Sequence, residues 1–108
     1  MTEIKQIWTG DLPPYPDADI ALIRPAAGGE LYEVYACFWL FRYLHRFEHA
    51  TATLAGDYCF GRFSHHLAIL DNVELTDAFS AFLREDTLNA RDIGTYLNFV
   101  RESSRLMQ

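Results

Sequence analysis

Residues 30–70 read ELYEVYACFWLFRYLHRFEHATATLAGDYCFGRFSHHLAIL, and this stretch decides the fold class. It contains no proline, and its apolar residues recur at helical spacing. The spacing predicts two long helices, about Glu30 to Phe47 and roughly Thr51 to Leu70. Positions Val34 to Phe41 are apolar on every face, so the first helix should be buried on more than one side.

The second helix contains Gly56 and Gly61 in its interior. An interior glycine costs a helix about 1 kcal/mol relative to alanine, so two of them favour a close approach of a neighbouring helix. Two further helices are predicted downstream, about Val73 to Arg84 and about Leu88 to Arg105. Their starts are marked by residues suited to breaking or capping a helix, which are Asp71 and Asn72 for the third and Asp86 or Thr87 for the fourth.

Residues 1–29 hold all four prolines and half of the six glycines. Long helices cannot run through prolines at this spacing. We therefore expect an irregular arm with one short turn from Ala18 to Ile23, capped by Asp17 and anchored on the core or on a partner through Ile20, Leu22 and Ile23. The organisation predicted is this Pro/Gly-rich arm over 1–29, followed by an all-α domain over 30–108, a small bundle of about four helices.

The composition excludes several partners. The 108 residues carry a net charge of −6, whereas nucleic acids and anionic membrane surfaces are bound by basic faces. No apolar run reaches the length of about 18 residues that a membrane span needs, and we expect a cytoplasmic protein. Half of the residues are hydrophobic and 15% are aromatic, so a partner or self-association is expected to cover part of the apolar surface. Cys37 and Cys59 fall in apolar helical patterns, where free cysteine behaves as a small buried hydrophobe.

One motif suggests an enzyme. His45, Glu48 and His49 form an H-x-x-E-H pattern, in which two imidazoles one helical turn apart hold zinc and the carboxylate activates a bound water. A zinc hydrolase also needs a third protein ligand, and the remaining carboxylates have no distinguishing context. The alternative is that both histidines lie at a helix end and hold no metal, which we favour.

A second motif suggests a family. Ile23-Arg24-Pro25, the long apolar helix and Ala52-Thr53-Leu54-Ala55-Gly56-Asp57-Tyr58 follow one another in the order of the early core helices of trans-polyprenyl diphosphate synthases. Asp71-Asn72-Val73-Glu74-Leu75 resembles the turn that follows. The resemblance covers about 24–84, a little over half of the chain, and its most specific part is Leu54 to Tyr58.

Catalytic members of that family bind magnesium and an allylic diphosphate through D-D-x-x-D clusters, and this chain contains none. Where the first cluster would follow the apolar helix, Arg46 and Phe47 stand instead. The chain thus resembles the non-catalytic small subunit of heterodimeric hexaprenyl and heptaprenyl synthases. The resemblance implies part of the isoprenoid synthase fold and no activity alone. It also implies a catalytic partner that carries the magnesium, and a role in setting activity and product chain length.

On this interpretation four apolar residues of the first helix line the partner interface or the end of the elongation tunnel: Val34, Phe38, Trp39 and Phe41. For any one of them, a place in the chain's own core is the competing interpretation. A third hypothesis is an unrelated helical adaptor or inhibitor that binds another protein through the surface from Val34 to Phe41.

Overall fold

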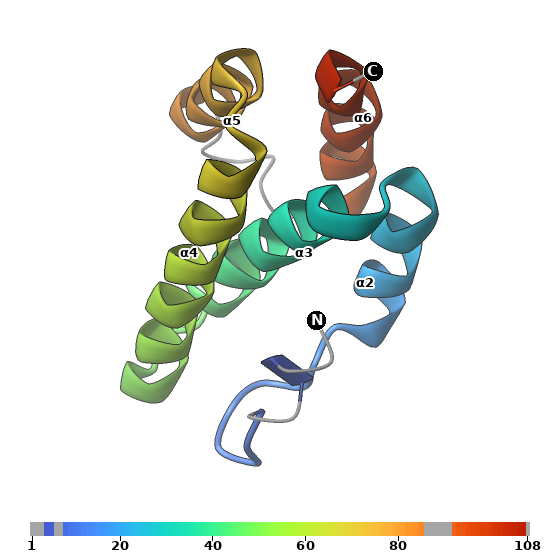
Figure 1. Ribbon diagram of the computed structural model, residues 1–108. Coiled ribbons are helices and arrows are strands. Elements are labelled where there is room, and N and C mark those ends of the chain that lie inside the picture. The colour runs from blue at the N-terminus through green and yellow to red at the C-terminus, as the bar shows by residue number, and fades with distance from the viewer. Residues whose placement is uncertain (1–3, 6–7, 86–91, 108) are drawn as a thin grey trace.

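The computed structural model describes residues 4–5, 8–85 and 92–107, and within them the chain is all-α (Figure 1). No strand occurs in this described part. The α-helices are α2 (Asp17–Ile23), α3 (Gly29–Leu44), α4 (Ala50–Leu70), α5 (Val73–Glu85) and α6 (Ile93–Ser104), with short 3-10 turns η1 (Arg24–Ala26) and η3 (Arg105–Met107). The predicted all-α class is confirmed.

Helix α3 occupies the centre of the molecule, with α4 along one side and α2 and α6 on the other (Figure 1). Its most extensive packing is against α4. Every residue from Val34 to Leu40 is at most 1% exposed. The prediction that this helix is buried on more than one side is therefore confirmed, because its apolar residues face α4, α2 and α6 at once.

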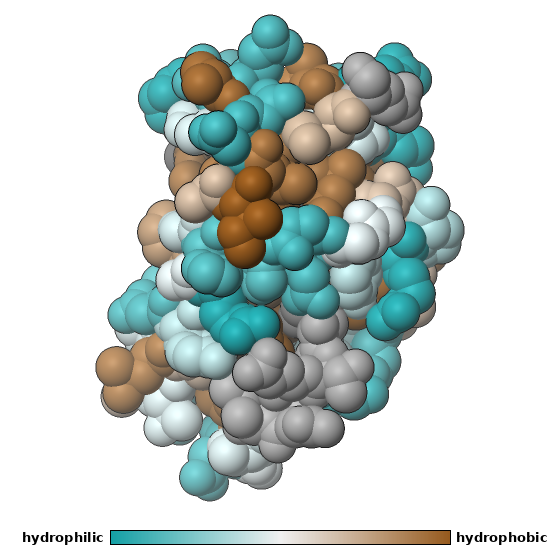
Figure 2. Space-filling view, in the orientation of Figure 1, coloured by the Kyte–Doolittle hydropathy of each residue, from teal (hydrophilic) through white to brown (hydrophobic). Residues whose placement is uncertain are grey.

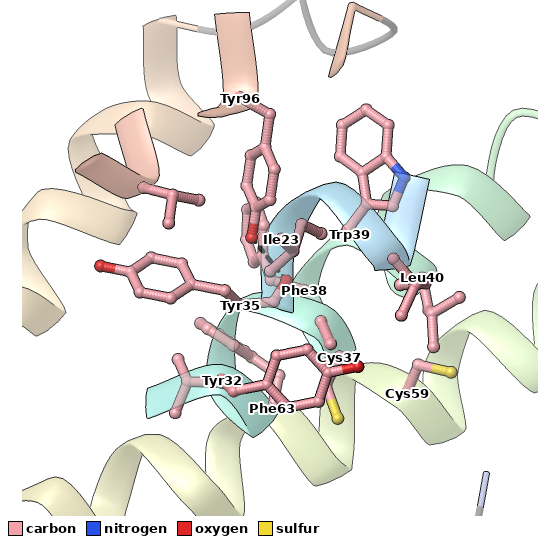
Figure 3. Close-up of a cluster of buried hydrophobic side chains, with 14 of the residues drawn as sticks. Ile23, Tyr32, Tyr35, Cys37, Phe38, Trp39, Leu40, Cys59, Phe63 and Tyr96 are labelled. Carbon is pink, nitrogen blue, oxygen red and sulfur yellow. Dashed lines mark hydrogen bonds between the residues drawn. The ribbon is translucent and has the colours of Figure 1, made fainter. Parts of the chain in front are cut away.

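The core is largely aromatic (Figure 3). The ring of Phe38 lies 5.0 Å from the rings of both Phe63 and Phe79, and it stacks on Tyr96 at 5.9 Å. These contacts join one residue of α3 to residues of α4, α5 and α6. The aromatic residues counted in the sequence thus serve first to connect the helices of this chain to one another.

Helix α3 ends earlier than predicted, so the connection between α3 and α4 is longer. Helix α3 ends at Leu44, three residues before the expected Phe47, because the N–H groups of Arg46 and Phe47 bond to carbonyls only three residues back. His49 is in extended conformation and is the N-cap of α4. The next break is as predicted: Asp71 has φ 49°, and the side chain of Asn72 accepts a hydrogen bond from Leu75 N at 2.9 Å.

The N-caps of α2 and α6 are not the residues that the sequence predicted. Pro16 is the N-cap of α2, and Asp17 is its first residue, whose carboxylate instead accepts a hydrogen bond from Lys5. Asp92 precedes α6 and caps it by accepting from Gly94 N at 2.9 Å. The predicted caps Asp86 and Thr87, and the predicted start of the helix at Leu88, lie outside the described residues.

The arm packs on the helices. Ile20 and Ile23 are buried as predicted, and Ile4 is buried as well, whereas Leu22 is exposed and does not anchor the arm on the core. A helix as short as α2 turns only one stripe toward the core, and Ile20 and Ile23 occupy it. The other predicted role of Leu22, contact with a partner, stays a prediction. The arm and the helices therefore share one hydrophobic core.

Candidate partner-binding surfaces

The four residues predicted to line a partner interface lie mostly in the interior. Val34, Phe38 and Trp39 are buried within the chain's own core, and Phe41 is partly buried against Phe60, with ring centroids 4.8 Å apart. A partner could reach the first three only if helices of this chain moved apart. Their assignment to an interface stays a prediction, and the side chains that are already accessible lie elsewhere.

The family-like motif forms the first turns of α4, and its two faces differ. Gly56 and Cys59 are buried against α3, whereas Leu54 is 69% exposed and Tyr58 is 46% exposed. Leu54 and Tyr58 are four residues apart, so they lie one above the other on the outer face of the helix. The motif therefore places two large apolar side chains in solvent, next to the residues that pack it on the core.

The buried side of the motif holds an imidazole. A Cβ atom on Gly56 would lie 2.6 Å from Nε2 of His45, too close for any real side chain, so the glycine makes room for this ring. His45 Nε2 also lies 3.0 Å from Oδ1 of Asp57. The predicted close approach at Gly56 is confirmed, although the group that approaches is a side chain. At Gly61 no described residue outside the helix lies within 4 Å of a Cβ position, and there the prediction was wrong.

The H-x-x-E-H pattern is divided between two helices. His45 is the C-cap of α3 and His49 is the N-cap of α4, where its Nδ1 accepts from Ala52 N at 3.4 Å. The zinc hypothesis needs both imidazoles on one face of a helix, and the structure does not place them so, because α3 ends before the pattern begins. Both histidines lie at helix ends, as the favoured alternative has it. Among the described residues, no group of three or more histidine, cysteine, aspartate or glutamate side chains is placed to hold a metal ion.

Both cysteines are buried thiols at the α3–α4 interface, where Figure 3 shows them in the apolar cluster. Burial raises the pKa of each thiol to about 12. The thiolate is the reactive form of cysteine, so both thiols are unreactive at neutral pH. This agrees with their interpretation as small core hydrophobes.

A small apolar cavity adjoins the exposed side of the motif. It measures about 80 Å³ and lies between the arm and α4, lined by Ile4, Trp8, Leu12, Ala55, Tyr58 and Cys59. Tyr58 therefore borders both open solvent and an apolar recess. Together, Leu54, Tyr58 and the recess beside Tyr58 form what we call the motif surface, which can receive an apolar side chain from a partner.

A second concave surface lies between α5 and α6, and we call it the α5–α6 groove. It has a volume of about 330 Å³ and is lined by Ala78, Ala81, Phe82, Glu85, Phe99, Glu102, Ser103 and Leu106. The sequence analysis predicted the helix that carries Phe82 but did not find the groove. The small residues Ala78 and Ala81 lie on the same face of α5 as Glu85. This pattern is the signal in the sequence that could have indicated the groove.

No family model, no curated protein and no solved structure matches this chain. No helix in the described part of the chain combines the length and the apolar character that crossing a bilayer requires.

Proposed function

We propose that this chain is a non-catalytic helical subunit that binds a catalytic trans-polyprenyl diphosphate synthase and thereby adjusts its activity and product chain length. The observation that carries the proposal is the motif surface. The most family-like segment of the sequence presents Leu54 and Tyr58 to solvent, and burial of both side chains against a partner would stabilise a complex by roughly 2–4 kcal/mol.

The contact between Asp57 and His45 supports a role for this aspartate in packing rather than in metal binding. In the described structure the carboxylate of Asp57 lies 3.0 Å from Nε2 of His45, so the contact links the start of α4 to the end of α3. An aspartate used in this way positions the exposed residues on either side of it, Leu54 and Tyr58. The motif then acts as a rigid apolar surface, which is what a subunit that works through association needs.

The test is reconstitution with a synthase of the same cell that carries two D-D-x-x-D motifs. The two chains are co-expressed and purified, and the complex is measured by size-exclusion chromatography with light scattering. Isopentenyl incorporation and product length are then compared with and without this chain. We expect a stoichiometric complex and a change in rate or product length, and the absence of a complex contradicts the proposal.

A matched pair of variants locates the interface. Leu54→Asp places a charge on the motif surface, whereas Val73→Asp places one at a side chain of similar exposure, 73%, at the start of α5. Both variants should fold, because both side chains are in solvent. Leu54→Asp should weaken the complex at least tenfold, since a buried unpaired carboxylate is costly, and Val73→Asp should leave it unchanged.

A further inference from the structure

The α5–α6 groove is apolar on its floor and acidic at its rim. Its apolar members are Ala78, Ala81, Phe82, Phe99 and Leu106, and its charged members are Glu85 and Glu102. Apolar side chains gather between α5 and α6 in the upper part of Figure 2, bordered by polar residues. None of the described residues that line the groove is basic.

Aromatic contacts at the base of the groove fix its shape. Phe82 of α5 stacks on Phe99 of α6 with ring centroids 4.5 Å apart, and Phe79 meets Phe99 edge to face at 5.0 Å. These contacts hold the two helices together below the surface. Above them Ala78 and Ala81 supply only methyl groups, so α5 and α6 leave space between them that larger side chains would have filled.

The polar groups of the groove floor are already used. Ser103 Oγ donates to the carbonyl of Phe99 at 2.6 Å and also bonds to the hydroxyl of Tyr35 at 2.6 Å. The hydroxyl therefore offers little to a ligand. What remains for recognition is an apolar groove between α5 and α6 with one carboxylate on each helix. Such a surface suits an apolar stripe that is flanked by positive charge.

We propose that the α5–α6 groove binds one amphipathic helix of another protein, with large apolar residues at positions i, i+3, i+4 and i+7 and lysine or arginine beside them. When an amphipathic helix binds in a groove between two helices, its large apolar side chains are buried as they would be in a helix–helix interface of a protein core. Basic side chains at the edges of that face would meet Glu85 and Glu102.

The charge of the rim argues against a second copy of this chain as the occupant. In a two-fold dimer the same patch meets itself, so the acidic rims of the two copies would face each other. The groove is also separate from the motif surface, which lies at the opposite end of α4 from α5 (Figure 1). The inference therefore stands independently of the proposed synthase partner.

The test uses the full chain and a fluorescent synthetic peptide of about 16 residues, long enough to form a helix. One face of the peptide carries leucine at helical spacing, and lysine flanks that face. Two control peptides have glutamate in place of lysine, or the same residues in scrambled order. Fluorescence polarisation should show saturable binding of the first peptide that weakens with added salt, and at least about tenfold weaker binding of both controls.

Variants of the groove complete the test. Ala81→Gln fills the groove without a charge and should weaken binding of the peptide at least tenfold. Glu85→Lys/Glu102→Lys should weaken it about fivefold, because exposed ion pairs each contribute modestly. The control Glu48→Lys/Glu74→Lys reverses two exposed glutamates outside the groove and should leave the affinity unchanged.

Three results overturn the inference. One is no saturable binding of the lysine peptide up to about 1 mM, a concentration that corresponds to a negligible affinity. Another is equal binding by the wild-type chain and Ala81→Gln, both confirmed as folded by circular dichroism. The third is a wild-type dimer in light scattering that Ala81→Gln converts to a monomer, which would assign the groove to a second copy.

Discussion

The imidazole of His45 occupies the space that a side chain on Gly56 would need, so the end of α3 and the first turns of α4 fit together at this one point. The same ring lies 3.0 Å from the carboxylate of Asp57. A glycine inside a 21-residue helix is thus explained by its neighbour rather than by its own backbone, which is ordinary helix.

Replacing the two interior glycines of α4 by alanine should give opposite results. Gly61→Ala should raise the free energy of unfolding by about 0.5–1 kcal/mol, because alanine favours helix and no described residue outside the helix lies within 4 Å of the new methyl group. Gly56→Ala should lower it by about 1 kcal/mol, because the methyl group displaces His45 from its place beside Asp57. Urea denaturation followed by circular dichroism measures both.

The cause of the difference can be isolated by removing the ring. In a His45→Ala background, Gly56→Ala should become stabilising, by roughly the amount seen for Gly61→Ala. The coupling between the two positions would then be about 1.5–2 kcal/mol in a double-mutant cycle. A Gly56→Ala penalty that persists without the His45 ring would show that contact with this ring is not its origin.

The buried hydroxyls of Tyr35 and Ser103 should depend on each other. They bond at 2.6 Å across the core between α3 and α6, and Ser103 also donates to the carbonyl of Phe99. Ser103→Ala should cost about 1–3 kcal/mol, because it leaves the Tyr35 hydroxyl buried without a partner. The double variant Tyr35→Phe/Ser103→Ala should cost less than the sum of the two single changes, as measured by chemical denaturation. A strictly additive cycle would contradict the coupling.

The helices could be predicted from the sequence because their signals are local. The apolar run from Val34 to Phe41, and the pair Asp71 and Asn72, specify a buried helix and a helix break through residues a few positions apart. The end of α3 at Leu44 could not be predicted, since His45 to Phe47 continue the apolar and basic pattern and their turn depends on where α4 packs. The H-x-x-E-H interpretation depended on that same helix end.

The exposure of the candidate interface residues could be predicted only in part. Val34, Phe38 and Trp39 look the same in sequence whether they meet another chain or the chain's own core, and in the structure all three are buried in that core. Leu54 and Tyr58 belong to the segment that carries the family resemblance, but their exposure follows from which side of α4 faces α3. The α5–α6 groove depends on the distance between two helices, which no local pattern encodes.

Stability should fall above about pH 9. Burial raises the folded-state pKa of Cys37 and Cys59 from the ordinary 9.0 to about 12. Below pH 9 the folded and unfolded chains both hold these protons, so the thiols cause no change with pH. Between pH 9 and 12 only the unfolded chain releases them, and the free energy of unfolding should fall by up to ~1.4 kcal/mol per pH unit for each thiol.

Two buried tyrosines continue this trend at higher pH. Burial raises the pKa of Tyr35 and raises that of Tyr96 well above its ordinary value of 10.0. Urea denaturation at half-unit intervals from pH 8 to 11 should therefore show a decline that begins near pH 9 and steepens near pH 10. The variant Cys37→Ala/Cys59→Ala is less stable throughout, and its decline should begin only near pH 10. An unchanged onset would mean that the thiols are not the groups responsible.

The N-cap of α4 should accept a better capping residue. His49 fills this position with a long hydrogen bond of 3.4 Å from Ala52 N to its ring nitrogen, and the first turn of α4 contains no acidic residue. His49→Asp supplies a short acceptor and a negative charge at the positive end of the helix, so thermal unfolding should show a gain of about 0.5–1 kcal/mol. His49→Ala removes the acceptor and should lose a similar amount or less. A His49→Asp variant no more stable than His49→Ala would show that the helix start does not depend on this side chain.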